Sequence, residues 1–433
     1  MRQLRIVIAG IGLAAAAAFS GVTAAAATAS PVGTASATST AGGPGSLDPT
    51  FGNGGVALAS VGGQAVATDA VLQSNGDIVV ATENTPEAGI VRFLPNGTLD
   101  HTFGSNGFAS AGFNDMGLSP SGVAIQPDGK IVWVGNTTAQ VTGGSVTDFA
   151  IARFNPNGTL DSGFGSGGQA TTEFFAPPMV GAQELADAVL VQSDGKILVG
   201  GSATQGQIRF APKQPALLRL NANGTPDTTF GTGGRVLSAG PGNITALGLD
   251  AAGDIFTLPT YAEFSPSGQA DASVTPAAIT VSSHGGAAAF LPSGQFVVAT
   301  AFNVAKHDVD VQVQRFNAGG SVASTSPSFD YSGAIGLDQA LDFVGAVAIQ
   351  ANGSAIASGS HFFGTSVFGL ARVNASGSLD TTFGNGGTLT TSIQGGDSAG
   401  ALVIQPDGKI IAVGTSQNNS TGQIDVALVR YLG

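Results

Sequence analysis

Cysteine is absent from this chain of 433 residues, and tryptophan occurs once. Without cysteine the protein can form no disulfide framework, no thiolate zinc site and no iron–sulfur cluster, and it has no cysteine nucleophile. The composition alone therefore excludes these classes of scaffold and chemistry.

Charged residues are also scarce, at 10% of the chain, and cations are the rarer kind. Fifteen lysines and arginines stand against 28 aspartates and glutamates, which gives a net charge of −13. General binding to nucleic acid depends on neutralising phosphates with cations, so we expect no nucleic-acid partner.

Apolar residues and glycine are abundant instead. Hydrophobic residues make up 42% of the chain, enough for a large core, and the 66 glycines follow no Gly-X-Y period, which excludes collagen. This balance predicts a turn-rich, all-β protein.

The first 40 residues differ from the rest. Arg2 and Arg5 precede an apolar run of 14 residues, Ile6–Phe19, and small residues follow it. This order is typical of a secretory signal peptide, and the run is too short to span a bilayer of about 30 Å. We expect a signal peptide over residues 1–29, with cleavage possible as far as Ala37, and a flexible lead-in over 30–45. The mature protein would be secreted, with no membrane span.

Beyond the lead-in, one pattern recurs, G-[ST]-L-D-x-T-F-G-x-x-G, with weaker copies around Asp271 and Ala323. The aspartates of the clear copies are Asp48, Asp100, Asp161, Asp227 and Asp380.

A second pattern places Q-x-D-G-K-I between two apolar stretches. It has seven copies, including variants, spaced about 55 residues apart. Their shared glycines are Gly76, Gly129, Gly195, Gly253, Gly294, Gly353 and Gly408.

A third pattern is an apolar strand that ends in A-R-F. One copy has Glu263 in place of arginine, and the arginines of the other copies are Arg92, Arg153, Arg219, Arg315, Arg372 and Arg430.

The turns of one unit indicate its structure. Asp-Gly between alternating apolar runs is a strong hairpin pattern, and Asn-Gly turns follow the arginine strands. Four short antiparallel strands in about 55 residues are typical of a propeller blade. The sequence therefore predicts one domain over residues 46–433, a seven-bladed β-propeller.

The two ends of the chain complement each other. Each repeated aspartate normally follows an arginine by eight residues, but Arg430 has no such aspartate and Asp48 has no such arginine. We therefore expect the N- and C-terminal strands to share one blade and close the ring, which removes exposed strand edges.

These motifs resemble those of the bacterial delta-60 repeat proteins. The resemblance rests on Gly158–Gly165, Ile125–Ile131 and Ile151–Phe154 with their repeats, and it covers roughly residues 45–433. It departs over 253–353, where the blade count is open. It implies a β-propeller and export, and it implies no reaction.

The repeated aspartates and arginines are the most conspicuous polar residues. A ring of carboxylates could bind cations or basic ligands, but repetition in nearly every unit favours turn capping or Arg–Asp pairing within the fold. The lysines Lys130, Lys196 and Lys409 are expected at solvated hairpin tips.

No other motif supports catalysis, a cofactor or a metal. Ser398 lies in a G-x-S-x-G pattern, but a hairpin strand follows where the nucleophile elbow needs a helix. His101, His284, His307 and His361 lack zinc spacing. Asp308 and Asp310 share a strand face and could bind calcium, although an exposed polar strand face is the favoured explanation.

The lengthened connections are where specificity is expected. Two of them, Phe174–Gln183 and Thr204–Pro215, contain aromatics and proline; the others are Thr137–Thr147 and Phe302–Asp308. We expect an exported, monomeric binding module whose partner is a cell-surface polymer, either carbohydrate or protein.

Two alternatives stay open. One is a structural or adhesive surface protein. The other is a hydrolase or lyase with acids at the central channel, for which the candidate acids are Glu173, Glu184, Glu263, Asp308 and Asp310.

Overall fold

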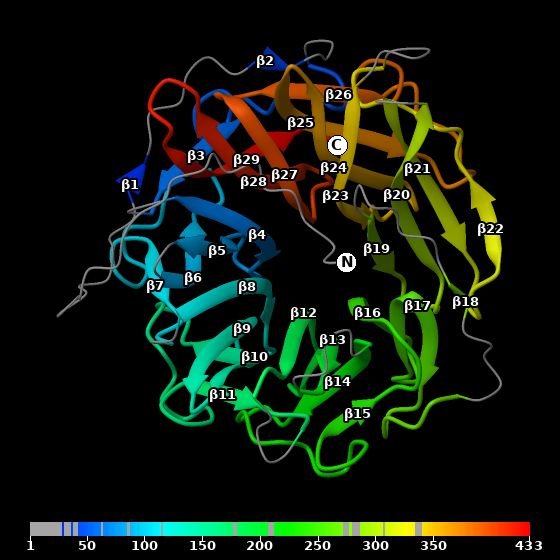
Figure 1. Ribbon diagram of the computed structural model, residues 1–433. Coiled ribbons are helices and arrows are strands. Elements are labelled where there is room, and N and C mark those ends of the chain that lie inside the picture. The colour runs from blue at the N-terminus through cyan, green and yellow to red at the C-terminus, as the bar shows by residue number, and fades with distance from the viewer. Residues whose placement is uncertain are drawn as a thin grey trace.

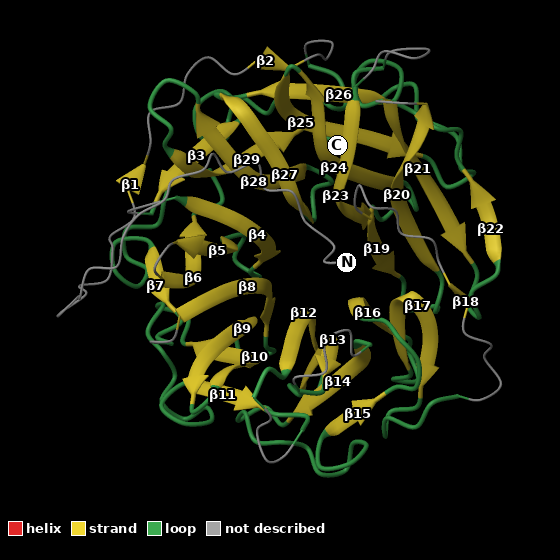
Figure 2. Cartoon of the chain, in the orientation of Figure 1, coloured by secondary structure: helices red, strands yellow, loops and turns green. Residues whose placement is uncertain are grey.

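The computed structural model describes residues 42–61, 64–84, 87–113, 116–175, 180–206, 212–271, 286–305, 308–333 and 340–433, with three two-residue strands outside these ranges. Most of the expected signal peptide and most of the lead-in lie outside the described residues. Every regular element in the described part is a β-strand (Figure 2). No described helix is long and apolar enough to cross a membrane. The all-β class predicted from the sequence is confirmed.

The first part of the described chain folds into three antiparallel groups of strands that follow sequence order, and the second and third groups are joined in one eight-stranded sheet. The first group contains β4 (Ala65–Leu72), β5 (Ile78–Asn84), β6 (Glu87–Phe93) and β7 (Phe108–Ser110). The second contains β8 (Met116–Ile125), β9 (Ile131–Val141), β10 (Gly144–Phe154) and β11 (Gln169–Thr172). The third contains β12 (Gln183–Val191), β13 (Ile197–Thr204), β14 (Gln214–Leu220) and β15 (Arg235–Leu237).

The later strands repeat this order, with a shorter group first. That group contains β16 (Ile244–Leu249), β17 (Ile255–Phe264) and β18 (Ala277–Ala278). Next come β19 (Gly286–Phe290), β20 (Phe296–Ala305), β21 (Asp308–Phe316) and β22 (Val322–Thr325). They are followed by β23 (Leu341–Ile349), β24 (Ala355–Phe363), β25 (Thr365–Val373) and β26 (Thr388–Ser392).

The last group combines both ends of the chain. It contains β27 (Gly395–Ile404), β28 (Ile410–Asn418) and β29 (Ile424–Tyr431), and β3 (Val56–Ser60) pairs antiparallel with β29. The two remaining strands are β1 (Thr28–Ala29), which pairs with β3, and β2 (Ser36–Ala37), which pairs with β26. The sequence predicts that the two ends share a sheet, and the β3–β29 ladder is that sheet.

These groups stand around a common centre (Figure 1). The first strand of each group is innermost, and the innermost strands contact one another in the cyclic order β4, β8, β12, β16, β19, β23, β27 and again β4. Single parallel pairs such as Thr147↔Gln183 and Ser366↔Gly396 join the third strand of one group to the first strand of the next.

The core lies between neighbouring sheets. Trp133 on β9 is fully buried, and it belongs to the same apolar cluster as Val79 and Ala81 on β5. Another cluster joins Val80 on β5 to Val413 on β28, so residues from both halves of the chain pack together. Burial of these apolar faces, at about 25 cal/mol per Å², is the main force that holds sheet against sheet.

The strands give the ring two unlike ends. The Asp-Gly hairpins lie at one end. In one of them, Ile125 pairs with Ile131 on either side of Asp128 and Gly129. The other end contains the starts of the innermost strands and the hairpins between the second and third strands of a group. In one of these hairpins, Val141 pairs with Gly144. The second end, which we call the loop end, includes Thr137–Thr147 and the described part of Phe302–Asp308. The expected lengthened connection Thr137–Thr147 is instead a tight hairpin, because β9 continues to Val141 and β10 starts at Gly144.

Candidate functional site

Five repeated arginines form ion pairs with five repeated aspartates, and in four of these pairs the two residues are separated by a single turn. Arg219 Nε lies 2.8 Å from Asp227 Oδ2, and Arg430 Nε lies 3.0 Å from Asp48 Oδ2. The pairs Arg92–Asp100, Arg153–Asp161 and Arg372–Asp380 have the same arrangement, with N–O distances of 2.6 to 2.9 Å.

Each of these arginines also lies over a phenylalanine ring of its own repeat. The guanidinium carbon is 4.3 Å from the ring centroid in the Arg92–Phe103 pair and 4.8 Å in the Arg153–Phe164 pair. Such cation–π contacts add to the ion pair at buried sites.

The same guanidinium groups reach the next sheet. Arg430 donates to the carbonyl of Pro95 (2.7 Å), and Arg153 donates to the carbonyl of Ala222. One side chain thus joins its own turn to the following repeat.

Both carboxylate oxygens of these aspartates have partners within this arrangement, as Asp48 shows. Asp48 Oδ1 accepts hydrogen bonds from the backbone N–H and the hydroxyl of Thr50, and Oδ2 accepts a hydrogen bond from Arg430 Nε. Burial alone would raise the pKa of Asp48, but the Thr50 hydrogen bonds and the Arg430 charge outweigh it and lower the pKa to about 2.

The hairpin lysines do not lie free in solvent, in contrast to the expectation. Lys130 Nζ is 2.8 Å from Asp161 Oδ2, Lys196 is 3.2 Å from Asp227, and Lys409 is 3.3 Å from Asp48. The Asp-Gly hairpin and the repeated aspartate lie at the same end of the ring, which brings the lysine within reach of the carboxylate.

Two repeats depart from this pattern. Arg315 has Ala323 where an aspartate would stand, and it donates instead to the carbonyls of Gly353 (2.7 Å) and Asn374 (3.2 Å). Burial lowers the pKa of Arg315.

The other departure concentrates negative charge. Glu263 replaces arginine, and its pKa is raised by burial and then by the charges of Asp254, Asp271 and Asp250.

At the loop end, three buried acids occupy equivalent places at the starts of innermost strands. Glu184 Oε1 accepts from the backbone N–H groups of Phe174 (2.7 Å) and Phe175 (3.3 Å). Asp397 and Asp342 likewise accept from the connection that precedes them. Each of these carboxylates therefore hydrogen-bonds to the backbone of the segment that leads into its innermost strand.

Asp342 also belongs to a compact polar cluster. Its Oδ1 is 2.8 Å from His361 Nδ1, and His361 Nδ1 is 3.5 Å from Asp330 Oδ1. Burial, opposed by the His361 hydrogen bond and reinforced by the Asp330 charge, raises the pKa of Asp342 to about 7. The sequence motifs did not indicate this cluster, because the three residues come from segments without ligand spacing.

Among the described residues, the other candidates do not come together in one catalytic centre. Ser398 lies within β27 and receives a hydrogen bond from the hydroxyl of Ser360 (2.8 Å). His284 and His307 lie outside the described residues. Asp308 is 1% exposed, so the expected exposed polar face is wrong for that residue, and Asp310 is half-buried.

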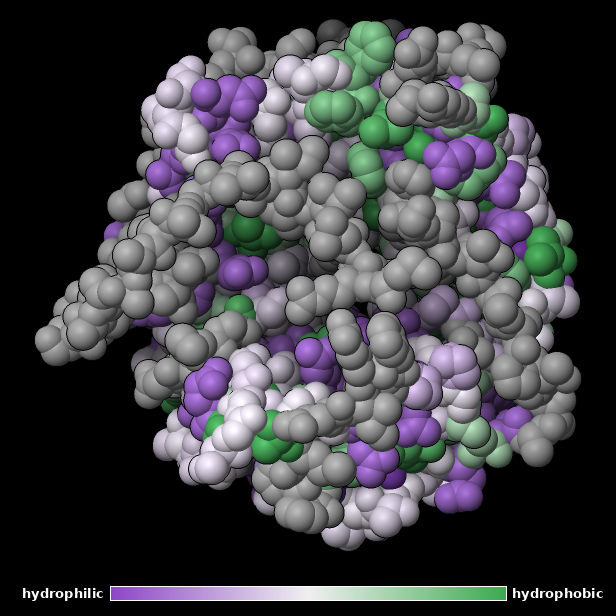
Figure 3. All heavy atoms as spheres, in the orientation of Figure 1, coloured by the Kyte–Doolittle hydropathy of each residue, from purple (hydrophilic) through white to green (hydrophobic). Residues whose placement is uncertain are grey.

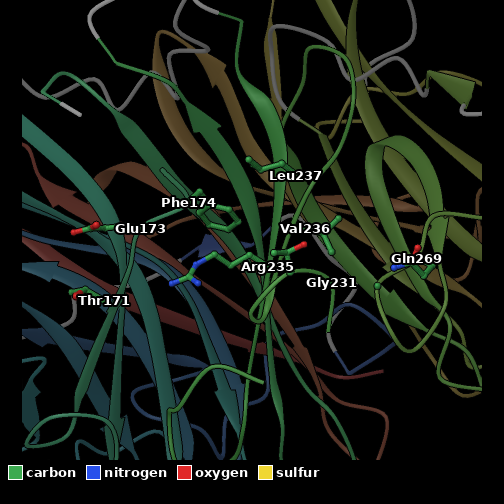
Figure 4. Close-up of a pocket in the computed structure, with 10 residues that line it drawn as sticks. Thr171, Glu173, Phe174, Gly231, Arg235, Val236, Leu237 and Gln269 are labelled. Atoms are coloured by element: carbon green, nitrogen blue, oxygen red, sulfur yellow. The ribbon is translucent and has the colours of Figure 1, made fainter. Parts of the chain in front are cut away.

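An open groove of about 800 Å³ lies between the outer strands of two neighbouring groups of strands (Figure 4). Its residues come from β11 and the segment after it, from β15, and from the turn that follows β17. They include Thr171, Glu173, Phe174, Arg235, Leu237 and Gln269.

The groove combines one cation, one acid and apolar surface. Arg235 extends toward the side on which Thr171 and Glu173 lie (Figure 4). The Phe174 ring packs edge-on against Phe149, with centroids 5.2 Å apart. The sequence singled out Phe174 as part of a ligand rim, and it overlooked Arg235, which sits in an otherwise ordinary strand. On the face shown in Figure 3, hydrophilic and hydrophobic residues are interspersed.

Comparison with known proteins supports the fold. Five segments, 73–103, 126–164, 192–230, 350–383 and 405–432, match the model of the family "Domain of unknown function (DUF5122) beta-propeller". No protein with a curated description is similar to this chain in sequence.

Similar solved structures are distant. A catalytically inactive virginiamycin B lyase from Staphylococcus aureus with quinupristin is 9% identical, with a TM-score of 0.44, covering 86% of this chain and 98% of its own. A protein of unknown function from Dyadobacter fermentans is 12% identical, with a TM-score of 0.45, covering 90% and 97%. A glucose dehydrogenase is 12% identical, with a TM-score of 0.39, covering 68% and 93%. Likenesses this distant carry no argument about a substrate. The repeat segments support a β-propeller family for this chain.

Proposed function

We propose that this chain is an exported, monomeric β-propeller of seven blades that binds an extended carbohydrate in the groove between β11 and β15. The blade count is supported by the seven Asp-Gly-type turns and by the cyclic contacts of the innermost strands. Export is supported by the basic start, apolar run and small residues of the first 29 residues.

The groove is the observation that carries the binding role. It is open, as the site for a polymer must be, and it offers an aromatic ring, a guanidinium, a carboxylate and an amide. The hydroxyl groups of a sugar form hydrogen bonds with such charged and amide groups. Its C–H faces pack on aromatic and aliphatic side chains. A site that combines both features favours carbohydrate over an apolar ligand.

The enzyme alternative has weaker support. Glu173 and Glu184 are electrostatic neighbours, whereas the charges acting on Glu263 are those of Asp250, Asp254 and Asp271. Glu173 and Glu184 therefore lie in one place and Glu263 in another, so these candidate acids do not all converge on a single site.

A glycan array probed with the mature chain tests the binding role. We expect binding to a polysaccharide class, weakened at least about tenfold by Arg235→Ala and by Phe174→Ala. Lys213→Ala is the matched control, because Lys213 is an exposed cation that immediately precedes β14 and does not line the groove, and it should leave affinity unchanged.

Three outcomes would contradict the proposal. Absence of glycan binding together with capture of a defined protein ligand would favour a protein partner. Release of reducing or unsaturated ends from a bound polysaccharide would favour the enzyme. Binding that survives both groove substitutions would place the ligand elsewhere.

A further inference from the structure

Three buried ionisable side chains from different segments meet at the start of β23. Asp330 precedes the connection into that strand, Asp342 lies on β23 and His361 lies opposite it on β24. Their exposed fractions are 5%, 0% and 8%, and one ligand atom from each lies within 4.8 Å of the other two.

We propose that Asp330, Asp342 and His361 bind a single structural divalent cation of the zinc or manganese class. Bonds of about 2.1 Å at tetrahedral or octahedral angles place neighbouring ligand atoms about 3.0 to 3.5 Å apart. From His361 Nδ1, the distance of 3.5 Å to Asp330 Oδ1 matches that spacing, and the 2.8 Å hydrogen bond to Asp342 Oδ1 is slightly shorter than it. An imidazole ligand favours zinc or manganese over calcium and magnesium, which prefer oxygen.

Equivalent acids elsewhere in the ring show what the fold itself requires. Asp397 begins β27 and is satisfied by the N–H groups of Ile393 and Gln394 and by the hydroxyl of Ser416, which lies on the paired strand. To fix the segment that crosses into an innermost strand, the fold therefore needs one carboxylate and one neutral hydrogen-bond partner.

The cluster at β23 contains more than this role needs. Asp342 accepts the N–H of Tyr331, as Asp397 accepts that of Ile393, but a histidine and a second buried acid are added. Two neighbouring buried carboxylates repel each other, and a divalent cation would offset both charges.

The cation would link two neighbouring groups of strands. Asp330 lies beyond the end of β22, whereas Asp342 and His361 belong to the group that begins with β23, and the parallel β21–β23 pair already joins the two groups. A bound ion would fix the crossing between them at the loop end, so metal affinity would appear as folding stability. This site is independent of the groove.

Titration of the chelator-treated mature chain tests the proposal. Calorimetry with Zn²⁺ and with Mn²⁺ should give one saturable site per chain, and the melting temperature should rise with metal concentration. His361→Ala and Asp342→Asn should each weaken binding at least about tenfold.

Asp397→Asn is the matched control, since it removes an equivalent buried carboxylate that has no histidine. It should lower stability and leave metal affinity unchanged, with far-UV circular dichroism confirming that each variant is folded. The wild-type titration decides the matter even where a variant fails to fold. No saturable binding by wild type, tighter binding of Ca²⁺ than of Zn²⁺ or Mn²⁺, or an equal loss of affinity in Asp397→Asn would each overturn the proposal.

Discussion

Arg430 Nε donates to Asp48 Oδ2 over 3.0 Å, although the two residues are 382 positions apart in the chain. Elsewhere the same contact joins residues eight positions apart, as in Arg219–Asp227. The one pair that spans the chain therefore fastens its two ends into a shared sheet.

Arg430→Ala should lower the free energy of unfolding by about 3 kcal/mol, because it leaves Asp48 buried without its guanidinium. Urea denaturation of the single variants and of Arg430→Ala with Asp48→Asn measures the coupling. The double variant should lose less than the sum of the two single losses. Additive losses would show that the pair contributes nothing as a pair.

Glu184 should make the protein less stable as the pH rises. Burial, with added repulsion from Asp148 and Glu173, raises the pKa of Glu184 to about 7. A raised pKa in the folded state means that its stability contribution is full below about pH 4.5 and is lost as the pH rises through 7.

Glu184→Gln should therefore reduce the fall in stability between pH 5 and pH 8, by on the order of 2 kcal/mol. Urea midpoints of wild type and variant at both pH values provide the measurement. An identical pH dependence in the two proteins would contradict the raised pKa.

Glu263→Arg should stabilise the protein. It restores a cation eight residues before Asp271 and relieves the repulsion with Asp254 and Asp250, for a gain of about 1 kcal/mol. Glu263→Gln removes only the repulsion and should give a smaller gain. Thermal melting compares the two, and a loss of stability in both would refute the electrostatic account.

Gly224→Ala should destabilise the protein by about 2 to 4 kcal/mol. Gly224 has φ of +85°, and an added Cβ would lie 2.8 Å from the Phe164 ring. Gly167→Ala is the matched control, because Gly167 has φ of +64° and an added Cβ would meet nothing within 4 Å. Gly167→Ala should lose only the stability that backbone strain costs, and Gly224→Ala should lose more. Equal losses of stability in the two variants would contradict the role of close packing at Gly224.

Much of the fold could be predicted because each repeat carries its own turn residues. Asp-Gly and Asn-Gly mark the hairpins, and alternating apolar residues mark the strands between them, so the local pattern predicts the all-β class. The missing partners of Arg430 and Asp48 even predicted that the chain ends meet.

The candidate sites could not be predicted in the same way. Lys130 looked like a solvated hairpin residue, and only the packing of two turns at one end of the ring brings it to Asp161. Arg235 shows nothing unusual in sequence, yet it lines a groove formed by three separate segments.

The sequence by itself determined the repeated unit, its turns and the pairing of arginine with aspartate, because these depend on residues close together in the chain. Tertiary structure decided that His361 meets Asp342 and Asp330, and that Arg235 lines the same groove as Glu173 and Phe174. Such contacts arise where strands and connections from different repeats pack against each other, and strand register and burial set them without leaving a local pattern.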